Sequence, residues 1–359
     1  MEKAAVKEQP RKAFGWAARD TSGVLSPFHF SRRENGDEDV TIRILYCGVC
    51  HSDLHFARND WGLTSYPVVP GHEIVGVVTG SGRKVTKFRT GDRVGVGVII
   101  RSCMACDCCR EDLENYCPKR VVTYNGTDHD GSLTYGGYAD AIVVDQRFVL
   151  RFPDGLPSDG GAPLLCAGVS VYSPMMYYGM REPGKHLGVA GLGGLGHLAV
   201  KFGRAFGLKV TVISSSPSKE SEAIHKLGAD FFLYSKDQEK IQKELGTMDF
   251  IIDTISSVHS LDSLLGLLKV NGKLVTVGLP NQSLKLPIMP LVLGRKLVGG
   301  SITGGIKETQ EMLDFCTEHN IIADIEVIQM DSINEAFKRL ETSDIKYRFV
   351  VDISRSLYP

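Results

Sequence analysis

The sequence lacks an excess of charge of either sign, with 41 Lys and Arg against 42 Asp and Glu and a formal net charge of −1. Proteins that neutralise a phosphate backbone carry a basic surplus, so this balance argues against general nucleic-acid binding. The chain also lacks any apolar run near the ~18 residues that span a bilayer. Residues 1–11 are charged and have no apolar core of the kind found in secretory signals. We therefore expect a cytoplasmic protein with neither a membrane nor a nucleic acid as partner.

Internal repeats, low-complexity tracts and an obvious flexible linker are absent from the sequence as well. The chain has 359 residues, which at ~150 residues per domain corresponds to about two domains. Its composition is 43% hydrophobic and 23% charged, which is ordinary for a folded protein and too apolar for a disordered one. The sequence thus predicts a globular protein of two domains.

The two halves of the chain differ in their apolar pattern. From about residue 40 to 150, short apolar runs such as Val40–Tyr46 and Ile74–Thr79 are separated by glycine and proline, which predicts mostly β structure. From Gly188 onward, short strands alternate with helical segments, which predicts a parallel sheet with right-handed crossovers. The expected strands of this second part are Leu187–Ala190, Val210–Ser214, Phe250–Thr254 and Lys273–Gly278.

A glycine-rich loop lies between the first of these strands and a helix. Three glycines in this setting let backbone amides and a helix N-terminus approach a pyrophosphate. We therefore predict a dinucleotide site; a glycine turn needed only for packing is the alternative. The loop residues are Gly191, Leu192, Gly193, Gly194, Leu195 and Gly196.

The end of the second strand lacks the acidic residue that binds the ribose hydroxyls of NAD. In its place stand Ser214, Ser215 and Ser216, followed by Lys219. Hydroxyls and one ammonium group receive a 2′-phosphate, and no carboxylate repels it, so the loop predicts NADP(H) as cofactor. The alternative is a solvated serine loop, because no arginine is present.

The sequence has nine cysteines, and the spacing of four of them predicts a metal site. Cys103, Cys106, Cys109 and Cys117 supply four thiolates within fifteen residues, which suits a closed, structural zinc site. A redox switch and an iron–sulfur centre are the alternatives. Cys108 lies between two of the four and is a competing ligand, but the regular two-residue spacing favours its neighbours.

Three further residues from separate segments, Cys50, His72 and Cys166, offer a second metal site with an open fourth position. Taken singly, a buried cysteine is usually a small apolar residue, and a lone histidine is usually a satisfied core residue. Spacing alone does not select this trio.

A resemblance to a known family selects it. The motif Gly71-His72-Glu73-x2-Gly76-x5-Gly82-x2-Val85 resembles that of the zinc-containing medium-chain alcohol dehydrogenases. Three other stretches look like plant cinnamyl alcohol dehydrogenases, most closely the sinapyl alcohol dehydrogenase-like branch, which includes reductases of monoterpenoid and indole-alkaloid biosynthesis. These stretches are Tyr46–His55, Ala162–Gly168 and Lys346–Asp352.

The resemblance implies an α/β fold that combines a GroES-like, mostly β catalytic domain with a Rossmann domain. It places the first part of the catalytic domain at 1–166, with a structural zinc lobe at about 100–118. The NADP-binding Rossmann domain follows at 167–303, and the catalytic domain resumes at 304–359. It also implies a homodimer formed through the sheet edge near Val298–Thr303.

The resemblance further implies two Zn²⁺ ions per chain, one structural and one catalytic. Cys50, His72 and Cys166 would bind the catalytic ion, and Glu73 would lie behind them or bind it transiently. Ser52 would exchange a proton with the substrate oxygen, and His55 would relay that proton to solvent. The implied activity is the zinc- and NADPH-dependent, reversible reduction of an aldehyde to a primary alcohol.

The match loosens at the substrate pocket. Lignin-type members have an aromatic residue after the Tyr-Cys-Pro-Lys stretch and another after the Rossmann sheet, and the counterparts here are Val122 and Ile302. Losing two ring contacts favours a bulkier terpenoid or alkaloid aldehyde, with Trp61 and Leu63 as further wall residues. An iminium or enone reductase on the same fold is the competing activity, and a catalytically silent zinc- and dinucleotide-binding redox sensor is the non-enzymatic one. Because Ser52 and His55 are both present, we favour carbonyl chemistry.

Overall fold

The computed structural model describes residues 11–280 and 282–358, and their contacts divide the chain into two compact units. The first unit takes the described residues up to Cys166, then Gly305–Thr317 and those from Asp324 onward. The second unit takes Ala167–Gly304 and Glu318–Ala323. Residues 318–323, which we expected within the returning part of the catalytic domain, pack with the second unit. The first ten residues of the expected catalytic domain lie outside the described part.

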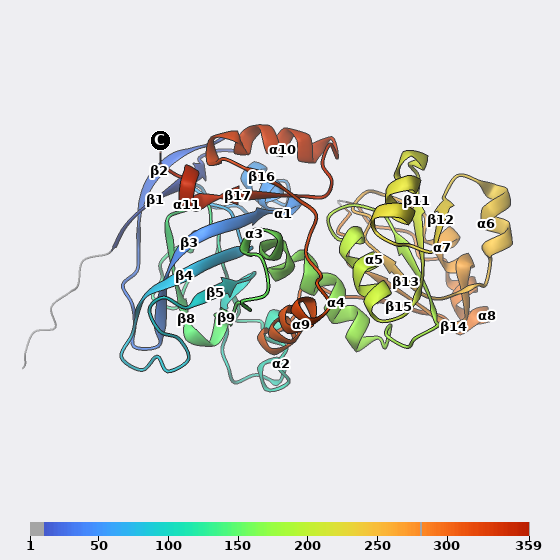
Figure 1. The fold of residues 1–359 in the computed structure, drawn as a ribbon, viewed down its shortest axis with the longest axis horizontal. Helices are drawn as coiled ribbons and strands as arrows, with labels where there is room; N and C mark the ends of the chain where they lie inside the picture. Colours follow the sequence, from blue (N-terminus) through green and yellow to red (C-terminus); the bar gives the residue numbers. More distant parts are fainter. Residues whose placement is uncertain (1–10, 281, 359) are drawn as a thin grey trace, which may run out of the picture. The chain divides into compact units, whose positions relative to one another are not determined.

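The first unit is mostly β (Figure 1). Its strands are β1 (Arg11–Ala18), β2 (Leu25–Arg32), β3 (Asp39–Val49), β4 (Ile74–Ser81), β5 (Arg93–Val96), β6 (Ile99–Arg101), β7 (Val121–Val122), β8 (Ala141–Asp145), β9 (Leu150–Arg151), β16 (Ile325–Ile328) and β17 (Arg348–Asp352). Its helices are α1 (His51–Arg58), α2 (Asp107–Arg110), α3 (Ser158–Gly161), α9 (Ile306–Glu318, whose last residue counts with the second unit), α10 (Ile333–Glu341) and α11 (Ile353–Ser356).

The long strand β3 organises the main sheet of this unit. Among the described residues the strand order is β16-β17-β3-β4-β5-β9, and β8 also pairs with β3. The C-terminal strand β17 runs antiparallel to β3, with Phe349 opposite Val49. Ile42, Ile44 and Phe349 are fully buried in the core beneath this sheet. Tertiary pairing thus brings the end of the chain beside the strand that leads to Cys50.

The helix α1 is a departure from the expected β pattern. It begins directly after Cys50, whose backbone amide donates to Asp53 Oδ2 at 2.8 Å. A carboxylate three residues after the first capping position is a recognised helix start, but it is usually paired with Ser or Thr at that position. Because Cys50 occupies the capping position instead, the sequence gives only a weak indication that a helix starts here.

The second unit consists of alternating strands and helices (Figure 1). In chain order these are α4 (Ala167–Tyr177), β10 (His186–Ala190), α5 (Gly196–Ala205), β11 (Lys209–Ser214), β12 (Phe231–Tyr234), α6 (Gln238–Glu244), β13 (Met248–Asp253), α7 (Leu261–Leu267), β14 (Leu268–Thr276), α8 (Ile288–Gly294) and β15 (Leu297–Gly300).

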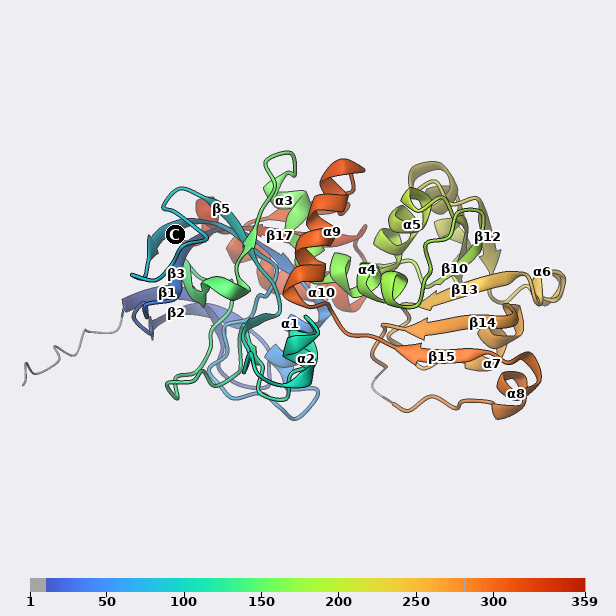
Figure 2. The same cartoon turned by 90° about the horizontal axis from the view of Figure 1, so that it is seen from below.

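All strand pairs in the sheet of this unit are parallel, in the order β12-β11-β10-β13-β14-β15 across the described residues. This confirms the expected doubly wound sheet, and Figure 2 shows β13, β14 and β15 side by side. From β10, the chain adds β11 and β12 on one side of the sheet and then β13, β14 and β15 on the other side, so the strand order changes between β10 and β13. In such sheets ligands bind at this point, outside the carboxyl ends of the strands.

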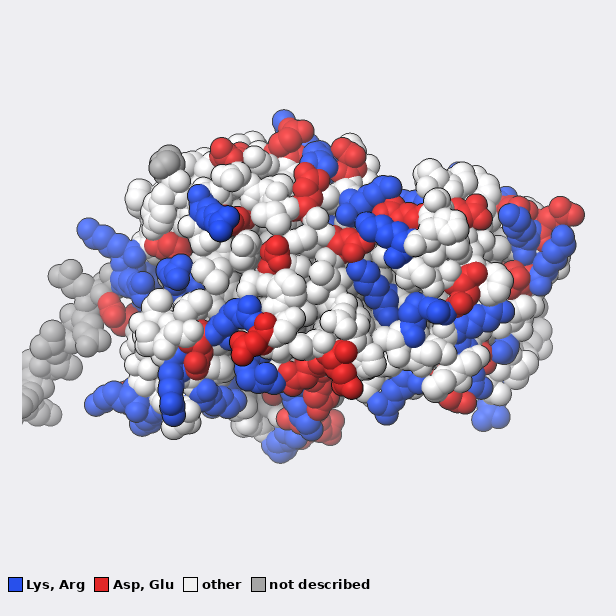
Figure 3. Space-filling model, in the orientation of Figure 1, with Lys and Arg blue, Asp and Glu red and all other residues white. Residues whose placement is uncertain are grey.

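Among the described residues, no helix combines the length and apolar character needed to cross a membrane. On the face drawn in Figure 3, basic and acidic side chains lie interspersed on each unit.

Candidate active site and metal centres

Two groups of potential metal ligands stand out in the first unit. In the first group, Cys50 precedes α1, His72 and Glu73 precede β4, and Cys166 ends the segment before α4. One ligand atom from each of these four residues lies within 4.8 Å of the others. Two thiolates, one imidazole and one carboxylate are ligand types that bind Zn²⁺. The tertiary fold thus brings together the trio that sequence spacing alone did not select.

A buried carboxylate, Asp53, orients the ligands of this group. Its Oδ1 lies 3.2 Å from His72 Nδ1 and accepts a hydrogen bond from the Gly71 amide at 3.0 Å. Its Oδ2 accepts hydrogen bonds from the Cys50 amide at 2.8 Å and from the Tyr138 hydroxyl at 3.1 Å. With Nδ1 engaged, His72 has Nε2 left for a metal, which is the usual carboxylate–histidine arrangement at zinc sites. Sequence reasoning did not single out Asp53.

Behind the same group lies a buried ion pair between Glu73 and Arg348. Arg348 comes from β17, and both side chains are shielded from solvent. Glu73 Oε2 accepts no hydrogen bond within the described part of the chain, and a side chain at Gly48 would collide with it. Burial raises the pKa of Glu73 to about 7, against the opposing effect of Arg348. Gly48 therefore makes room in β3 for a carboxylate beside the sulfur and nitrogen donors.

The expected proton-transfer residues share one face of α1, because Ser52 and His55 are three positions apart. Ser52 Oγ lies 3.6 Å from Cys50 Sγ. His55 Nδ1 lies 2.7 Å from Asp60 Oδ2, and the His55 ring packs 4.9 Å from the ring of Trp61. A hydrogen bond from Cys166 lowers the pKa of Cys50 well below its ordinary value, which favours a thiolate beside Ser52. Asp60, which holds the His55 ring, was missed in the sequence.

The second ligand group is the four-cysteine lobe. Cys103, Cys106, Cys109 and Cys117 have Sγ atoms within 4.8 Å of one another, with pairs at 3.5 Å and 3.9 Å. Sulfurs at tetrahedral corners around one zinc ion lie roughly 3.8 Å apart, so the spacing suits a single ion. Backbone amides of Ala105 and Cys106 lower the pKa of Cys103 to about 6. Cys108 is not part of the group.

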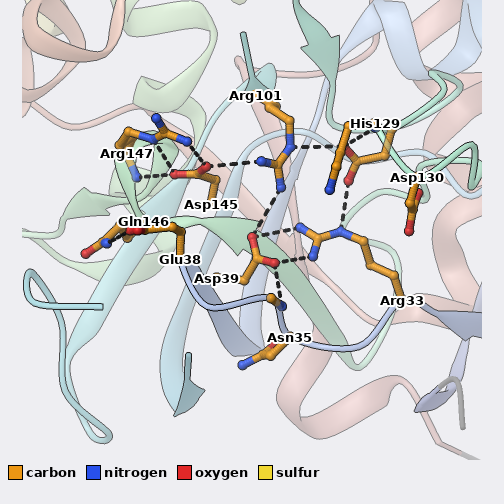
Figure 4. Close-up of polar contacts among 12 residues, drawn as sticks. Arg33, Asn35, Glu38, Asp39, Arg101, His129, Asp130, Asp145, Gln146 and Arg147 are labelled. Carbon is orange, nitrogen blue, oxygen red and sulfur yellow. Dashed lines mark hydrogen bonds and ion pairs between the residues drawn. The ribbon is translucent and has the colours of Figure 1, made fainter. Parts of the chain in front are cut away.

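A network of ion pairs anchors the start of this lobe (Figure 4). Arg101, two residues before Cys103, donates to Asp39 at 3.2 Å, Asp128 at 3.0 Å and Asp145 at 3.1 Å. Arg33 contacts two of the same carboxylates, Asp39 and Asp128. All three carboxylates are buried. The lobe thus begins from a point that is tied to β3, β8 and the loop after β7.

In the second unit, Gly191, Gly193 and Gly196 of the glycine-rich loop have different roles. Gly191 has φ +88°, a left-handed conformation that favours glycine. A side chain at Gly196 would collide with the Gly191 carbonyl oxygen, whereas one at Gly193 would meet nothing within 4 Å. The first glycine therefore makes the turn, the third allows close packing, and the second leaves open space where a pyrophosphate could approach.

The residues expected to choose the cofactor lie beside this loop. Lys219 Nζ donates to the carbonyl of Leu192 at 2.8 Å, and the Ser216 amide donates to Ser214 Oγ at 3.2 Å. Ser215 is exposed at the end of β11. The Lys219 ammonium group thus contacts the glycine-rich loop, and the three serines lie at and just after the end of β11.

Of the expected pocket residues, Trp61 lies beside His55, and Val122 is half-buried in β7. Leu63 is exposed in the first unit, and Ile302 is 48% exposed in the second.

Comparison with known families identifies both units. Residues 36–154 match the model "Alcohol dehydrogenase GroES-like domain", and residues 194–318 match "Zinc-binding dehydrogenase". Over 99% of both chains, this protein is 70% identical to a probable mannitol dehydrogenase of Medicago sativa. The chain belongs to the zinc-binding alcohol dehydrogenase family. Within this family it groups with plant cinnamyl alcohol and mannitol dehydrogenases, which confirms the resemblance seen in the sequence.

Two further curated relatives extend the comparison. A probable cinnamyl alcohol dehydrogenase 9 of Arabidopsis thaliana is 67% identical over 100% of both chains. An 8-hydroxygeraniol dehydrogenase of Catharanthus roseus is 57% identical over 99% of both chains. The relatives of this family therefore act, by name, on alcohols of different chemical classes.

Solved structures agree with the family assignment. A cinnamyl alcohol dehydrogenase of Sorghum bicolor has a TM-score of 0.95 at 56% identity, covering 96% of this chain and 99% of its own. A cinnamyl alcohol dehydrogenase of Helicobacter pylori, complexed with NADP(H), has a TM-score of 0.91 at 39% identity, covering 97% of this chain and 100% of its own. The predicted GroES-like and Rossmann fold is confirmed, and the chain is an oxidoreductase of the alcohol dehydrogenase class.

Proposed function

We propose that this enzyme uses zinc and NADP(H) to reduce an aldehyde reversibly to a primary alcohol. The observation that carries the proposal is the convergence of Cys50, His72 and Cys166, with the Ser52 hydroxyl 3.6 Å from Cys50 Sγ. Two thiolates and one imidazole leave a tetrahedral ion one further position, which Glu73 would take only transiently and the substrate oxygen would take during turnover, as at a catalytic rather than a structural zinc.

The residues present fit this ion, because the donors are soft and a buried carboxylate orients the imidazole. When bound, zinc polarises a carbonyl group toward hydride attack and acidifies the corresponding alcohol. The cofactor NADPH supplies the hydride in reduction, and NADP⁺ accepts it in oxidation. Glu73 lies in the same group of donors and is held from behind by Arg348.

The chain's own catalytic work is the transfer of a proton. As hydride reaches the carbonyl carbon, the carbonyl oxygen needs a proton, and the Ser52 hydroxyl is the group that would donate it. His55 would then restore that proton, because it lies on the same face of α1 as Ser52 and is half-exposed. The contact of Asp60 with His55 Nδ1 leaves Nε2 for this exchange.

The cofactor preference follows from charge at the end of β11. Lys219 and the hydroxyls of Ser214–Ser216 would receive a 2′-phosphate, and the solved Helicobacter pylori relative with NADP(H) supports this choice. We expect kcat/KM with NADPH to exceed that with NADH, and Ser215→Asp to reduce the ratio by about tenfold or more through repulsion, about 1.4 kcal/mol. The matched control is Ser263→Asp on the exposed face of α7, which should leave the ratio unchanged. Equal efficiency of the wild-type enzyme with both cofactors would contradict the assignment.

The four-cysteine lobe is proposed to hold the second zinc ion in a structural role. Elemental analysis should then find two zinc ions per wild-type chain and one in each of the variants Cys166→Ser and Cys109→Ser. Only Cys109→Ser should lower the unfolding temperature of the first unit substantially, because the lobe has little core of its own. Cys108→Ser is the matched control and should retain both ions.

Removal of all zinc by a chelator should abolish turnover. Iron in place of zinc, or a metal-free lobe with a disulfide, would support one of the alternatives.

The physiological substrate is proposed to be a terpenoid or alkaloid aldehyde rather than a lignin precursor, because Val122 and Ile302 are aliphatic. The test is incubation with NADPH and a panel of cinnamyl, monoterpenoid and indole-alkaloid aldehydes, with mannose included because of the mannitol dehydrogenase relatives. Product identification should show primary alcohols, with the highest kcat/KM on a non-planar aldehyde. Unchanged aldehydes beside a reduced iminium or enone would reverse the assignment.

The enzyme is proposed to be a homodimer formed at the β15 edge. β15 is the last strand of its sheet, and exposed apolar side chains gather on it and on α8, including Met289, Val292, Leu293 and Leu297. Within the part of the chain that the structure describes, no strand pairs with the outer edge of β15, and such an edge beside an apolar patch favours association with a second copy. Sedimentation should give the mass of two chains, and Val292→Asp should halve it, whereas Val24→Asp in the first unit should not. A monomeric wild type would refute this assembly.

A further inference from the structure

At the carboxyl end of β13 lies a carboxylate–imidazole pair that the proposed chemistry does not use, with Asp253 buried and the His259 side chain 14% exposed. Asp253 Oδ2 lies 2.9 Å from His259 Nε2, and Asp253 Oδ1 accepts a hydrogen bond from the Ile255 amide at 3.1 Å. The other ring nitrogen of His259, Nδ1, lies 2.9 Å from the Ser257 carbonyl oxygen. Segment 254–258 is therefore held at both its beginning and its end by two side chains.

Counting protons defines the charge of this pair. For both contacts of His259 to be hydrogen bonds, Nδ1 must carry a hydrogen, because the Ser257 carbonyl oxygen only accepts. The contact between Nε2 and Asp253 then requires a second hydrogen, placed either on the nitrogen or on the carboxyl oxygen. Burial raises the pKa of Asp253, with His259 opposing the shift. In both placements the pair as a whole is neutral.

The pair lies directly beside the glycine turn of the dinucleotide loop. Asp253 is the register partner of Ala190, the residue before Gly191. Thr254 Oγ1 donates to the Ala190 carbonyl at 2.9 Å, and a Cβ on Gly191 would lie 3.2 Å from Ile255 Cγ1. Contacts thus run without a gap from His259 through Asp253 to the turn.

The position in the sheet indicates which half of the ligand this segment would meet. β11 and β13 flank β10 on opposite sides, and a dinucleotide crosses the sheet at that point. Ser214–Lys219 follow β11, so segment 254–258 faces the half without the 2′-phosphate. Ser256, Ser257 and Val258 are exposed there, although the side chains of Asp253 and His259 hold the backbone at the two ends of the segment. A loop that binds nothing gains no affinity from an ordered backbone. A loop that binds a ligand does, because less conformational entropy is lost on binding.

We propose that His259 and Asp253 are positioning residues for the dinucleotide, ordering segment 254–258 and removing the carboxylate's charge beside the pyrophosphate turn. An unneutralised carboxylate at this place would repel the phosphates of the ligand. The inference rests on the proposed dinucleotide site. If the pair only locked the end of β13, its loss would lower stability but leave cofactor affinity unchanged.

Three variants of the full-length zinc-loaded enzyme test this inference, with the Kd of NADPH and of NADH measured by calorimetry. His259→Ala removes both contacts and should raise the Kd of NADPH about tenfold or more, with KM for NADPH rising by a larger factor than kcat falls. Asp253→Asn keeps a donor toward a neutral His259 and an acceptor for the Ile255 amide, so its Kd should stay within roughly threefold of wild type. His129→Ala, which loses a histidine contact with Asp128 in the first unit, is the matched control and should bind as wild type does.

Each outcome decides the matter. A wild-type Kd in His259→Ala overturns the inference, and so does an Asp253→Asn variant as weak as His259→Ala, since that would mean the charge itself is needed. Hydrogen exchange of the wild-type enzyme gives a second measurement should His259→Ala fail to fold. In the wild-type enzyme, adding NADPH should slow hydrogen exchange of the backbone amides at 254–258. An exchange rate that NADPH leaves unchanged overturns the inference. A wild-type enzyme that binds neither dinucleotide fails the proposed function itself, whereas preference for NADH fails only the cofactor choice, and the variants are then compared with NADH.

Discussion

Replacing Ser52 by alanine should lower kcat by about 10²- to 10⁴-fold, the range typical of a lost general acid–base group. The hydroxyl lies 3.6 Å from Cys50 Sγ, on a helix whose start is fixed by Asp53. The substitution removes one oxygen atom and leaves the metal donors in place. Steady-state kinetics with NADPH and a reducible aldehyde would measure the loss, and elemental analysis should still find the wild-type zinc content.

The matched control is Ser52→Thr, which keeps a hydroxyl at the same position and should retain most of the turnover. An alanine variant with wild-type kcat would remove Ser52 from the proton path. An alanine variant that also loses zinc would show that Ser52 supports the metal site instead.

Replacing Arg348 by methionine should destabilise the first unit by about 3–5 kcal/mol, because it leaves the buried carboxylate of Glu73 without its partner. The two side chains come from β17 and from the segment before β4, so the loss should act on the whole unit. In a domain of this size such a change lowers the unfolding temperature by on the order of 10 °C. Differential scanning calorimetry of the zinc-loaded enzyme would measure it.

A surface ion pair in the same unit provides the comparison for Arg348. Arg58 and Glu341 form a bidentate pair, at 2.7 Å and 3.0 Å, whereas Arg348 contacts Glu73 through one oxygen, and both Arg58 and Glu341 are substantially exposed. Arg58→Met should therefore cost no more than about 1 kcal/mol. Equal effects of the two substitutions would show that burial of Glu73 has no special energetic consequence.

The sequence was most informative where function depends on residues close together in the chain. The four cysteines of the lobe lie within fifteen residues, and the glycine loop lies between one strand and the next helix. Local spacing constrains such groups whatever the rest of the fold does. The doubly wound sheet was also predictable, because its strands and helices alternate along the chain and right-handed crossovers leave few arrangements.

The sequence was least informative about the side chains that support the site. Asp53 and Asp60 are ordinary charged residues in the printed sequence, and Arg348 is one of many basic residues. Each acquires its role from a neighbour that a strand pairing or a helix start brings close. The start of α1 at Cys50 places Asp53 under His72, and pairing of β17 with β3 places Arg348 against Glu73.

By itself, then, the sequence determined the family, the glycine-rich loop between a strand and a helix, and the cysteine lobe, since short motifs encode all three. Only the tertiary structure decided which distant residues meet. It brings Cys50, His72 and Cys166 together, pairs Glu73 with Arg348, and places His259 in contact with Asp253. The physical reason is the range of the interactions. Hydrogen bonds and ion pairs act over a few ångströms, and burial gives them their strength, so their partners are known only once the chain has folded.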